Sequence, residues 1–91
     1  MSVIERIQRK VRDREYYLSS HAEEEMAEDG FDRPDVENAI LEGFVGKKLT
    51  HDPRGTRYQI EGPAHDGRLM HVVCRFHETR NLIIITVYAK E

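Results

Sequence analysis

The 91-residue sequence has no tryptophan, one cysteine, three prolines and no long hydrophobic run. Cys74 alone cannot form an intramolecular disulfide, and no Cys/His spacing is typical of a zinc site. The longest apolar run, residues 82–85, is far shorter than the roughly 20 residues that span a bilayer, so we expect no membrane partner. Charged residues follow Met1 too early for a signal-peptide core, which predicts a cytoplasmic location.

Basic charge is scarce in the middle of the chain. Residues 19–43 carry nine acidic side chains and only Arg33 as a base, although the net charge of the whole chain is −3. Residues 44–91 carry eight basic and five acidic side chains, together with four of the five histidines. Because nucleic-acid binding needs cations against phosphates, the chain does not resemble a general nucleic-acid-coating protein, but a local basic face remains open.

The first part of the chain has the pattern of helices. Apolar residues recur at helical spacing over residues 3–13, and Ser2 with Glu5 has the spacing of a capping box. A second helix is expected to begin at His21 and to end at Gly30, which suits the left-handed position after a helix. The helix over residues 3–13 can also be an N-terminal extension of the domain.

Two further signals place the second and third helices. Ser20 and Glu23 repeat the capping-box spacing, which predicts Ser20 as the N-cap of the second helix. Asp32 or Arg33 caps the third helix, which ends at Gly43. The chain is long enough for one domain and too short for two, so residues 1–91 are expected to form a single unit.

After the third helix the pattern changes to strands with short turns between them. Apolar and polar residues alternate in residues 56–61, the next segment has two distinct faces, and residues 82–88 are apolar on both faces. The four expected strands are residues 44–50, 56–61, 70–77 and 82–88. Residues 16–18 form a short extended segment that could add a fifth. The predicted fold class is therefore α+β, with N-terminal helices packed on one face of a four- or five-stranded antiparallel sheet.

One face of this sheet collects residues that could perform acid–base chemistry. His71, Arg75 and His77 alternate along one strand, and Arg57 lies on a neighbouring strand. Metal-independent RNA cleavage needs a base, an acid and a cation near the phosphate, and these types could supply them. The alternative is that they form only the solvated face of a two-layer domain. Cys74 lies on the opposite face and is expected to be buried.

His21 has two interpretations. It lies in the first turn of its helix, where exposed N–H groups attract anions. Alternatively its ring packs over the sheet and bonds a backbone carbonyl. His21 and Glu25 are one helical turn apart, but two ligands without a third do not predict a metal site. The chain also lacks a Gly-rich phosphate loop and a nucleophile elbow, so we expect neither metal nor cofactor.

Several short motifs occur in a fixed order along residues 16–89. They are Ser20-His21-Ala22, Met26, Gly30, Asp35-Val36-Glu37, Arg57-Tyr58, the segment from Gly67 to Val73, and Ile85-Thr86-Val87-Tyr88. This ordered set resembles an uncharacterised family of small bacterial domains, of the domain-of-unknown-function class, allied to the RelE/ParE toxin superfamily. One departure is Glu25, where that family commonly has a basic residue.

The resemblance implies a RelE-like fold with helices on an antiparallel sheet. RelE-type toxins cleave messenger RNA on the ribosome, and ParE-type relatives poison gyrase. By this analogy the hydroxyl of Tyr88 could contact a substrate phosphate; as an alternative, Tyr88 is an aromatic residue at the edge of the core with a solvated tip. The resemblance also implies an antitoxin-like protein partner.

Three functions remain as hypotheses. The first is a toxin or toxin-derived, metal-independent ribonuclease acting on mRNA with the ribosome. Its candidate catalytic residues are His71, Arg57, Arg75, His21 and Tyr88. The second is a non-catalytic module that binds another protein or a second copy of itself. The third, a small-molecule or metal-linked enzyme, ranks last because the chain lacks the motifs such enzymes use.

Overall fold

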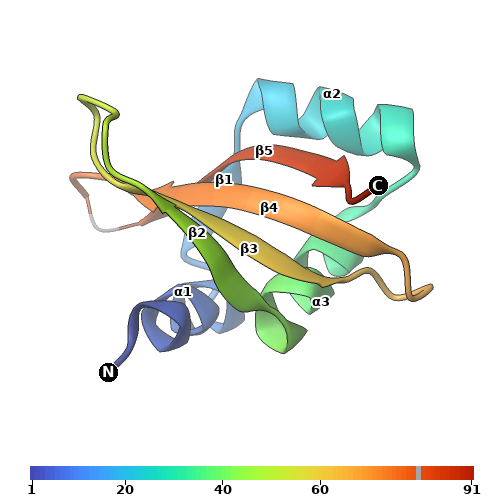
Figure 1. The fold of residues 1–91 in the computed structure, drawn as a ribbon, viewed down its shortest axis with the longest axis horizontal. Helices are drawn as coiled ribbons and strands as arrows, with labels where there is room; N and C mark the ends of the chain where they lie inside the picture. Colours follow the sequence, from blue (N-terminus) through green and yellow to red (C-terminus); the bar gives the residue numbers. More distant parts are fainter. Residues whose placement is uncertain (80) are drawn as a thin grey trace.

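The computed structural model describes residues 1–79 and 81–91, which form three helices and five strands (Figure 1). The elements are α1 (Val3–Arg12), β1 (Tyr16–Leu18), α2 (Ser20–Asp29), α3 (Arg33–Glu42), β2 (Phe44–Leu49), β3 (Arg57–Pro63), β4 (Leu69–Phe76) and β5 (Leu82–Ala89). The α+β class is confirmed. None of the helices in the described ranges is long and apolar enough to cross a membrane.

The five strands form one sheet in the order β1-β5-β4-β3-β2. Strands β2 to β5 are antiparallel to their neighbours, as predicted. The prediction of a wholly antiparallel sheet is wrong for β1, which is parallel to β5 with Tyr16 opposite Leu82. Two helices and three strands separate β1 from β5, so no hairpin turn imposes the antiparallel direction on this pair.

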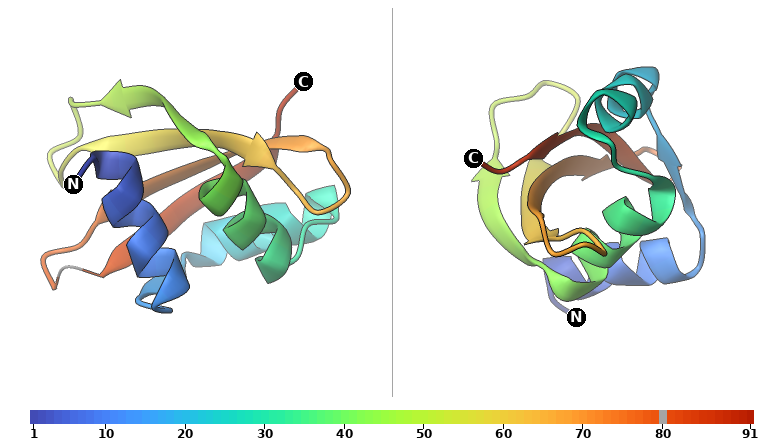
Figure 2. Two further views of the ribbon diagram at one scale, coloured as in Figure 1. Left: turned by 90° about the horizontal axis from the view of Figure 1, so that it is seen from below. Right: turned by 90° about the vertical axis from the view of Figure 1, so that its right-hand side faces the viewer.

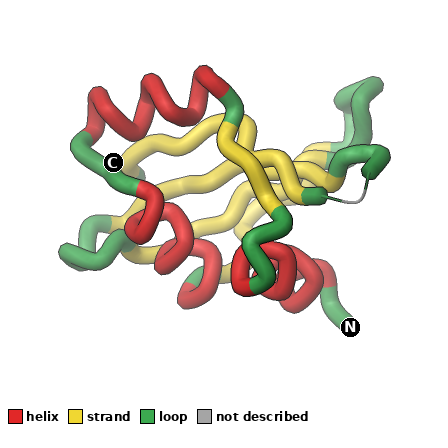
Figure 3. The backbone as a smooth tube through the Cα atoms, turned by 180° about the vertical axis from the view of Figure 1, so that it is seen from behind, coloured by secondary structure: helices red, strands yellow, loops and turns green. Residues whose placement is uncertain are grey.

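The helices and the sheet enclose one apolar core. Helices α1 and α3 lie together against one face of the curved sheet, and α2 runs along β5 (Figure 2). The view from behind shows the helices lying over the strands (Figure 3). The core combines residues of all these elements: Ile7, Val11, Ala22, Val36, Ala39, Ile40, Ile60, Met70, Val72, Cys74, Ile84 and Val87. The opposite face of β3, β4 and β5 is thereby left free of α1 and α3.

The start of α2 differs by one residue from the prediction. Ser19, and not Ser20, is the N-cap, because the Ala22 N–H donates to Ser19 Oγ at 3.0 Å. The Ser19 hydroxyl also donates to the carbonyl of Ile85 at 2.7 Å, which ties this residue to β5. The tertiary contact therefore decides between two adjacent serines. The capping box of α1 and the Asp32 cap of α3 are both present.

The end of α2 is fixed by a glycine and by a distant arginine. Gly30 has a φ of 72°, and the Phe31 N–H donates to the Met26 carbonyl at 2.8 Å, which closes the helix. Arg68, in the β3–β4 loop, stacks on the Phe31 ring at 4.3 Å and donates to the Asp29 carbonyl at 2.8 Å. The Gly-Arg sequence before β4 therefore has a structural role at this helix end.

Helix α2 also covers the edge of the sheet where β1 ends. Glu25 Oε1 accepts from the Val87 N–H at 3.1 Å and from the Thr86 hydroxyl. Asp29 Oδ2 accepts from the Ala89 N–H at 3.2 Å. These carboxylates satisfy donors that β1 is too short to reach, so Glu25 belongs to the sheet edge rather than to a fully solvated helix face.

Cys74 should be chemically inert while the protein is folded. Its side chain is fully buried, and burial raises the pKa of the thiol to about 12. Because the thiolate is the reactive form, we expect an aromatic disulfide reagent at mildly alkaline pH to modify native Cys74 at least about 100-fold more slowly than urea-unfolded Cys74. Stopped-flow absorbance would measure both rates; equal rates would contradict the burial.

Candidate functional site

A row of polar side chains crosses the free face of the sheet. Glu61 of β3 lies opposite His71 of β4, and His71 lies opposite Tyr88 of β5. Paired residues on adjacent strands project to the same face, so the three side chains are neighbours although they come from three strands.

These side chains form a continuous network. His71 Nε2 lies 3.1 Å from Glu61 Oε1, and the Lys90 ammonium lies 3.1 Å from Glu61 Oε2. The ring of Tyr88 stands edge-on to the imidazole of His71, with ring centroids 5.2 Å apart. The Tyr88 oxygen accepts from Gln59 Nε2 at 2.6 Å. A proton-binding imidazole is thus flanked by a carboxylate on one side and a phenol on the other.

The network opens into a groove of about 480 Å³. Gln59, His71 and Tyr88 line the groove from three adjacent strands. Lys47 of β2 borders it toward one edge of the sheet, and Asp29 of α2 borders it toward the other. A bound anion would therefore meet a lysine on the β2 side and the imidazole between the strands.

The imidazole of His71 is held mostly out of solvent. Its side chain is 17% exposed, and Nδ1 is buried without a hydrogen-bond partner among the described residues. If Glu61 is ionised, Nε2 must carry the hydrogen that it shares with the carboxylate, so Nδ1 carries the lone pair. The basic nitrogen is covered in this conformation. The side chains around Nδ1 must therefore move, or the imidazole must turn, before this nitrogen can accept a proton from a substrate.

The interactions of Glu61 should make part of the stability depend on pH. The hydrogen bond from His71, followed by that from Lys90, holds the pKa of Glu61 below its ordinary value of 4.5. A depressed carboxylate pKa stabilises the fold above pH 4.5, and this contribution is lost as the pH falls through the folded-state pKa. We expect the stability difference between the wild type and Glu61→Gln to shrink from about pH 6 to about pH 3 in urea unfolding. A difference that stays constant would contradict the linkage.

The structure brings His71 and Tyr88 together but places the two predicted arginines outside the groove. Arg57 forms an ion pair with Asp52 and lines a separate hollow at the β2–β3 turn. Arg75 is half-buried and lies opposite Ile83 of β5. Both arginines occupy the same face as His71 but lie two rows further along the strands, beyond the row of Gln59 and Val73.

His21 is not on this face. Its side chain is 66% exposed on α2, and its Nε2 lies 3.3 Å from Glu25 Oε1. The interpretation that the ring packs over the sheet and bonds a carbonyl is therefore wrong, because Glu25 pairs with it along the helix. Within residues 1–79 and 81–91, no group of three or more His, Cys, Asp or Glu side chains is arranged so that it could hold a metal ion.

Sequence reasoning left Glu61 and Lys90 out of the candidate set. A usable signal existed for Glu61: Pro63 pairs with Leu69 across the β3–β4 loop, and two further steps outward pair Glu61 with His71. Counting from the turn would have found this pair. Nothing comparable marks Lys90, which reaches Glu61 from beyond the end of β5.

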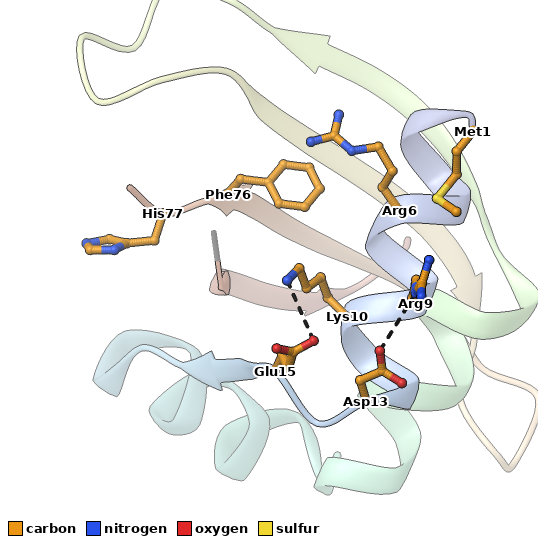
Figure 4. A pocket seen from close by; sticks show the side chains of 8 residues that line it. All are labelled: Met1, Arg6, Arg9, Lys10, Asp13, Glu15, Phe76 and His77. Carbon is orange, nitrogen blue, oxygen red and sulfur yellow. Dashed lines mark ion pairs between the residues drawn. The ribbon is translucent and has the colours of Figure 1, made fainter. Parts of the chain in front are cut away.

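A third hollow, of about 520 Å³, lies between α1 and the end of β4 (Figure 4). The guanidinium of Arg6 stacks over the Phe76 ring at 4.5 Å, and Lys10 pairs with Glu15 at 3.6 Å. Figure 4 shows the His77 ring pointing away from α1. The hollow therefore has cations but no imidazole–carboxylate pair, and the sheet groove remains the better candidate for chemistry.

Comparison with known proteins identifies one family. The model described as "Domain of unknown function (DUF4258)" matches residues 18–89, which include α2, α3 and β2 to β5 and exclude α1. No curated protein and no solved structure matches the chain.

Proposed function

The chain belongs to the DUF4258 family, whose description states no activity, and we propose that it is a metal-independent ribonuclease with its site on the free face of the sheet. The observation that carries this proposal is the His71–Glu61 pair, at 3.1 Å, whose imidazole lines one groove together with Tyr88. On this proposal the domain is RelE-like, and its substrate is messenger RNA.

The groove contains the types of group that RNA cleavage by internal transesterification requires. In that reaction the 2′-oxygen forms a bond to phosphorus while the bond to the 5′-oxygen breaks. His71 would take the proton of the 2′-hydroxyl, and the Glu61 carboxylate would stabilise the resulting imidazolium. Lys47 would neutralise charge that develops on the phosphate.

Tyr88 fits the role of the acid. Its oxygen already accepts a hydrogen bond from Gln59, so its own hydroxyl hydrogen is free to be donated to the departing 5′-oxygen. The acidic helices α2 and α3 would repel a polynucleotide, which favours approach to the sheet over approach to the helices. The sequence pI of about 5.9 is low for an RNA-binding protein, so we expect modest affinity for free RNA.

The proposal is tested with the purified chain and RNA in the presence of a chelator. Cleavage is expected to leave a 2′,3′-cyclic phosphate and a 5′-hydroxyl, which mass spectrometry of the products identifies. The same oligonucleotide with 2′-deoxyribose should remain intact, because it lacks the attacking oxygen. Since RelE-type toxins act on the ribosome, the assay is repeated on mRNA in a bacterial translation system. Intact transcripts in both settings would refute the proposal.

A further inference from the structure

The two edges of the sheet differ in how their backbone groups are covered. At one edge, β1 pairs with part of β5, and Glu25 and Asp29 of α2 satisfy N–H groups further along that strand. At the other edge, β2 pairs with β3 alone in the described part of the sheet. One row of β2 backbone groups is therefore left without a strand partner.

The residues of this open edge combine apolar and basic side chains. Phe44 is 57% exposed and Leu49 is 44% exposed, at the two ends of β2. Lys47 and Lys48 lie between them and are both exposed. Lysines on an edge strand discourage indiscriminate pairing, so a strand that does bind here must offset two positive charges.

A second copy of the chain is a poor occupant of this edge. Antiparallel self-pairing that matches Phe44 with Leu49 would set Lys47 opposite Gly46 and Lys48 opposite Val45 of the other copy. None of the four ammonium groups would then face a carboxylate, and a shifted register that sets Lys47 opposite Lys48 would place like charges directly across the strand pair, which is destabilising. The charge of β2 therefore favours an acidic occupant.

We propose that the β2 edge binds an extended segment of a partner protein that carries two consecutive acidic residues between apolar residues. Lys47 pairs with Gln59 and Lys48 with Tyr58, so the two lysines project to opposite faces of the sheet. Consecutive carboxylates on an added strand also project to opposite faces, and each meets one lysine. Apolar residues at the two ends of the segment pack on Phe44 and Leu49.

The experiment uses the full chain and a short capped peptide of alternating valine and threonine with a central Glu-Asp pair. Amide chemical shifts of the isotope-labelled chain are expected to change in β2 and to saturate with peptide concentration. A peptide with a central Lys-Lys pair should bind at least about tenfold more weakly, because it loses two charge pairs and adds repulsion.

Charge reversal gives the sharpest control. The Lys47→Glu/Lys48→Glu double variant should exchange the preference and bind the Lys-Lys peptide better than the Glu-Asp peptide. Arg9→Glu/Arg12→Glu, which makes the same change in net charge on α1, should leave both affinities unchanged. Shift changes outside β2, equal binding of the two peptides, or dimerisation through β2 without peptide would each overturn the proposal.

Discussion

Gly62→Ala is expected to lower the free energy of unfolding by about 3 kcal/mol, the largest loss from a single added methyl group in this sheet. A Cβ atom built on Gly62 would lie 2.0 Å from the carbonyl oxygen of Ala39 and 2.8 Å from its carbonyl carbon. Both are backbone atoms of α3, which cannot move aside as a flexible side chain could. The helix would have to withdraw from β3, which opens the core beneath it.

Gly46→Ala is the matched control for this prediction. The nearest atom to a Cβ at Gly46 is the Gln59 carbonyl oxygen at 3.8 Å, an ordinary contact. Its effect should therefore stay within about 0.5 kcal/mol. Urea unfolding followed by circular dichroism measures both variants. Similar unfolding midpoints for Gly46→Ala and Gly62→Ala would show that α3 does not pack so closely on β3.

The close packing at Gly62 also bears on the candidate site. Gly43 meets the same helix: its Cβ would lie 2.3 Å from the Ala39 carbonyl oxygen and 2.4 Å from that of Glu61. The end of α3 and the start of β2 are therefore fitted directly against the stretch of β3 that carries Glu61. A rigid backbone at this point fixes the position from which the carboxylate reaches His71.

Features determined by neighbouring residues could be predicted from the sequence. The capping box of Ser2 and Glu5 and the left-handed Gly30 are both present. Each depends on contacts within a few residues, so the local pattern suffices. The alternation along β3 and β4 likewise separated the buried face from the free face.

Features determined by distant contacts could not be predicted in this way. Ser19 was passed over as the helix cap because its second bond goes to Ile85, and the bond that Glu25 accepts from the Val87 N–H likewise joins residues far apart in the sequence. The candidate site also combines features that the local sequence indicates with features that depend on distant contacts. His71 and Tyr88 could be named from their residue types, but their partner Glu61 depends on the register between strands.

His71→Gln should reduce the rate of RNA cleavage by about 100-fold or more if the proposed function is right. Glutamine can still donate a hydrogen bond to Glu61, so the packing of the row is kept, but it cannot take up the proton of a 2′-hydroxyl. The loss should therefore appear in kcat, with KM little changed. Single-turnover cleavage of a labelled RNA measures it, with circular dichroism to confirm the fold.

His65→Gln is the matched control, because His65 is exposed in the β3–β4 loop and contacts Asp35 through its backbone N–H rather than its ring. This control variant should cleave RNA at the wild-type rate.

Tyr88→Phe tests the proposed acid without changing the proposed base. The ring that stands edge-on to His71 remains, and only the hydroxyl is lost. If His71→Gln retains full activity while the fold is intact, the imidazole is a structural member of the row and the base lies elsewhere. If Tyr88→Phe alone is fully active, the leaving oxygen takes its proton from another donor, for which the Lys90 ammonium, which also lines the groove, is a candidate.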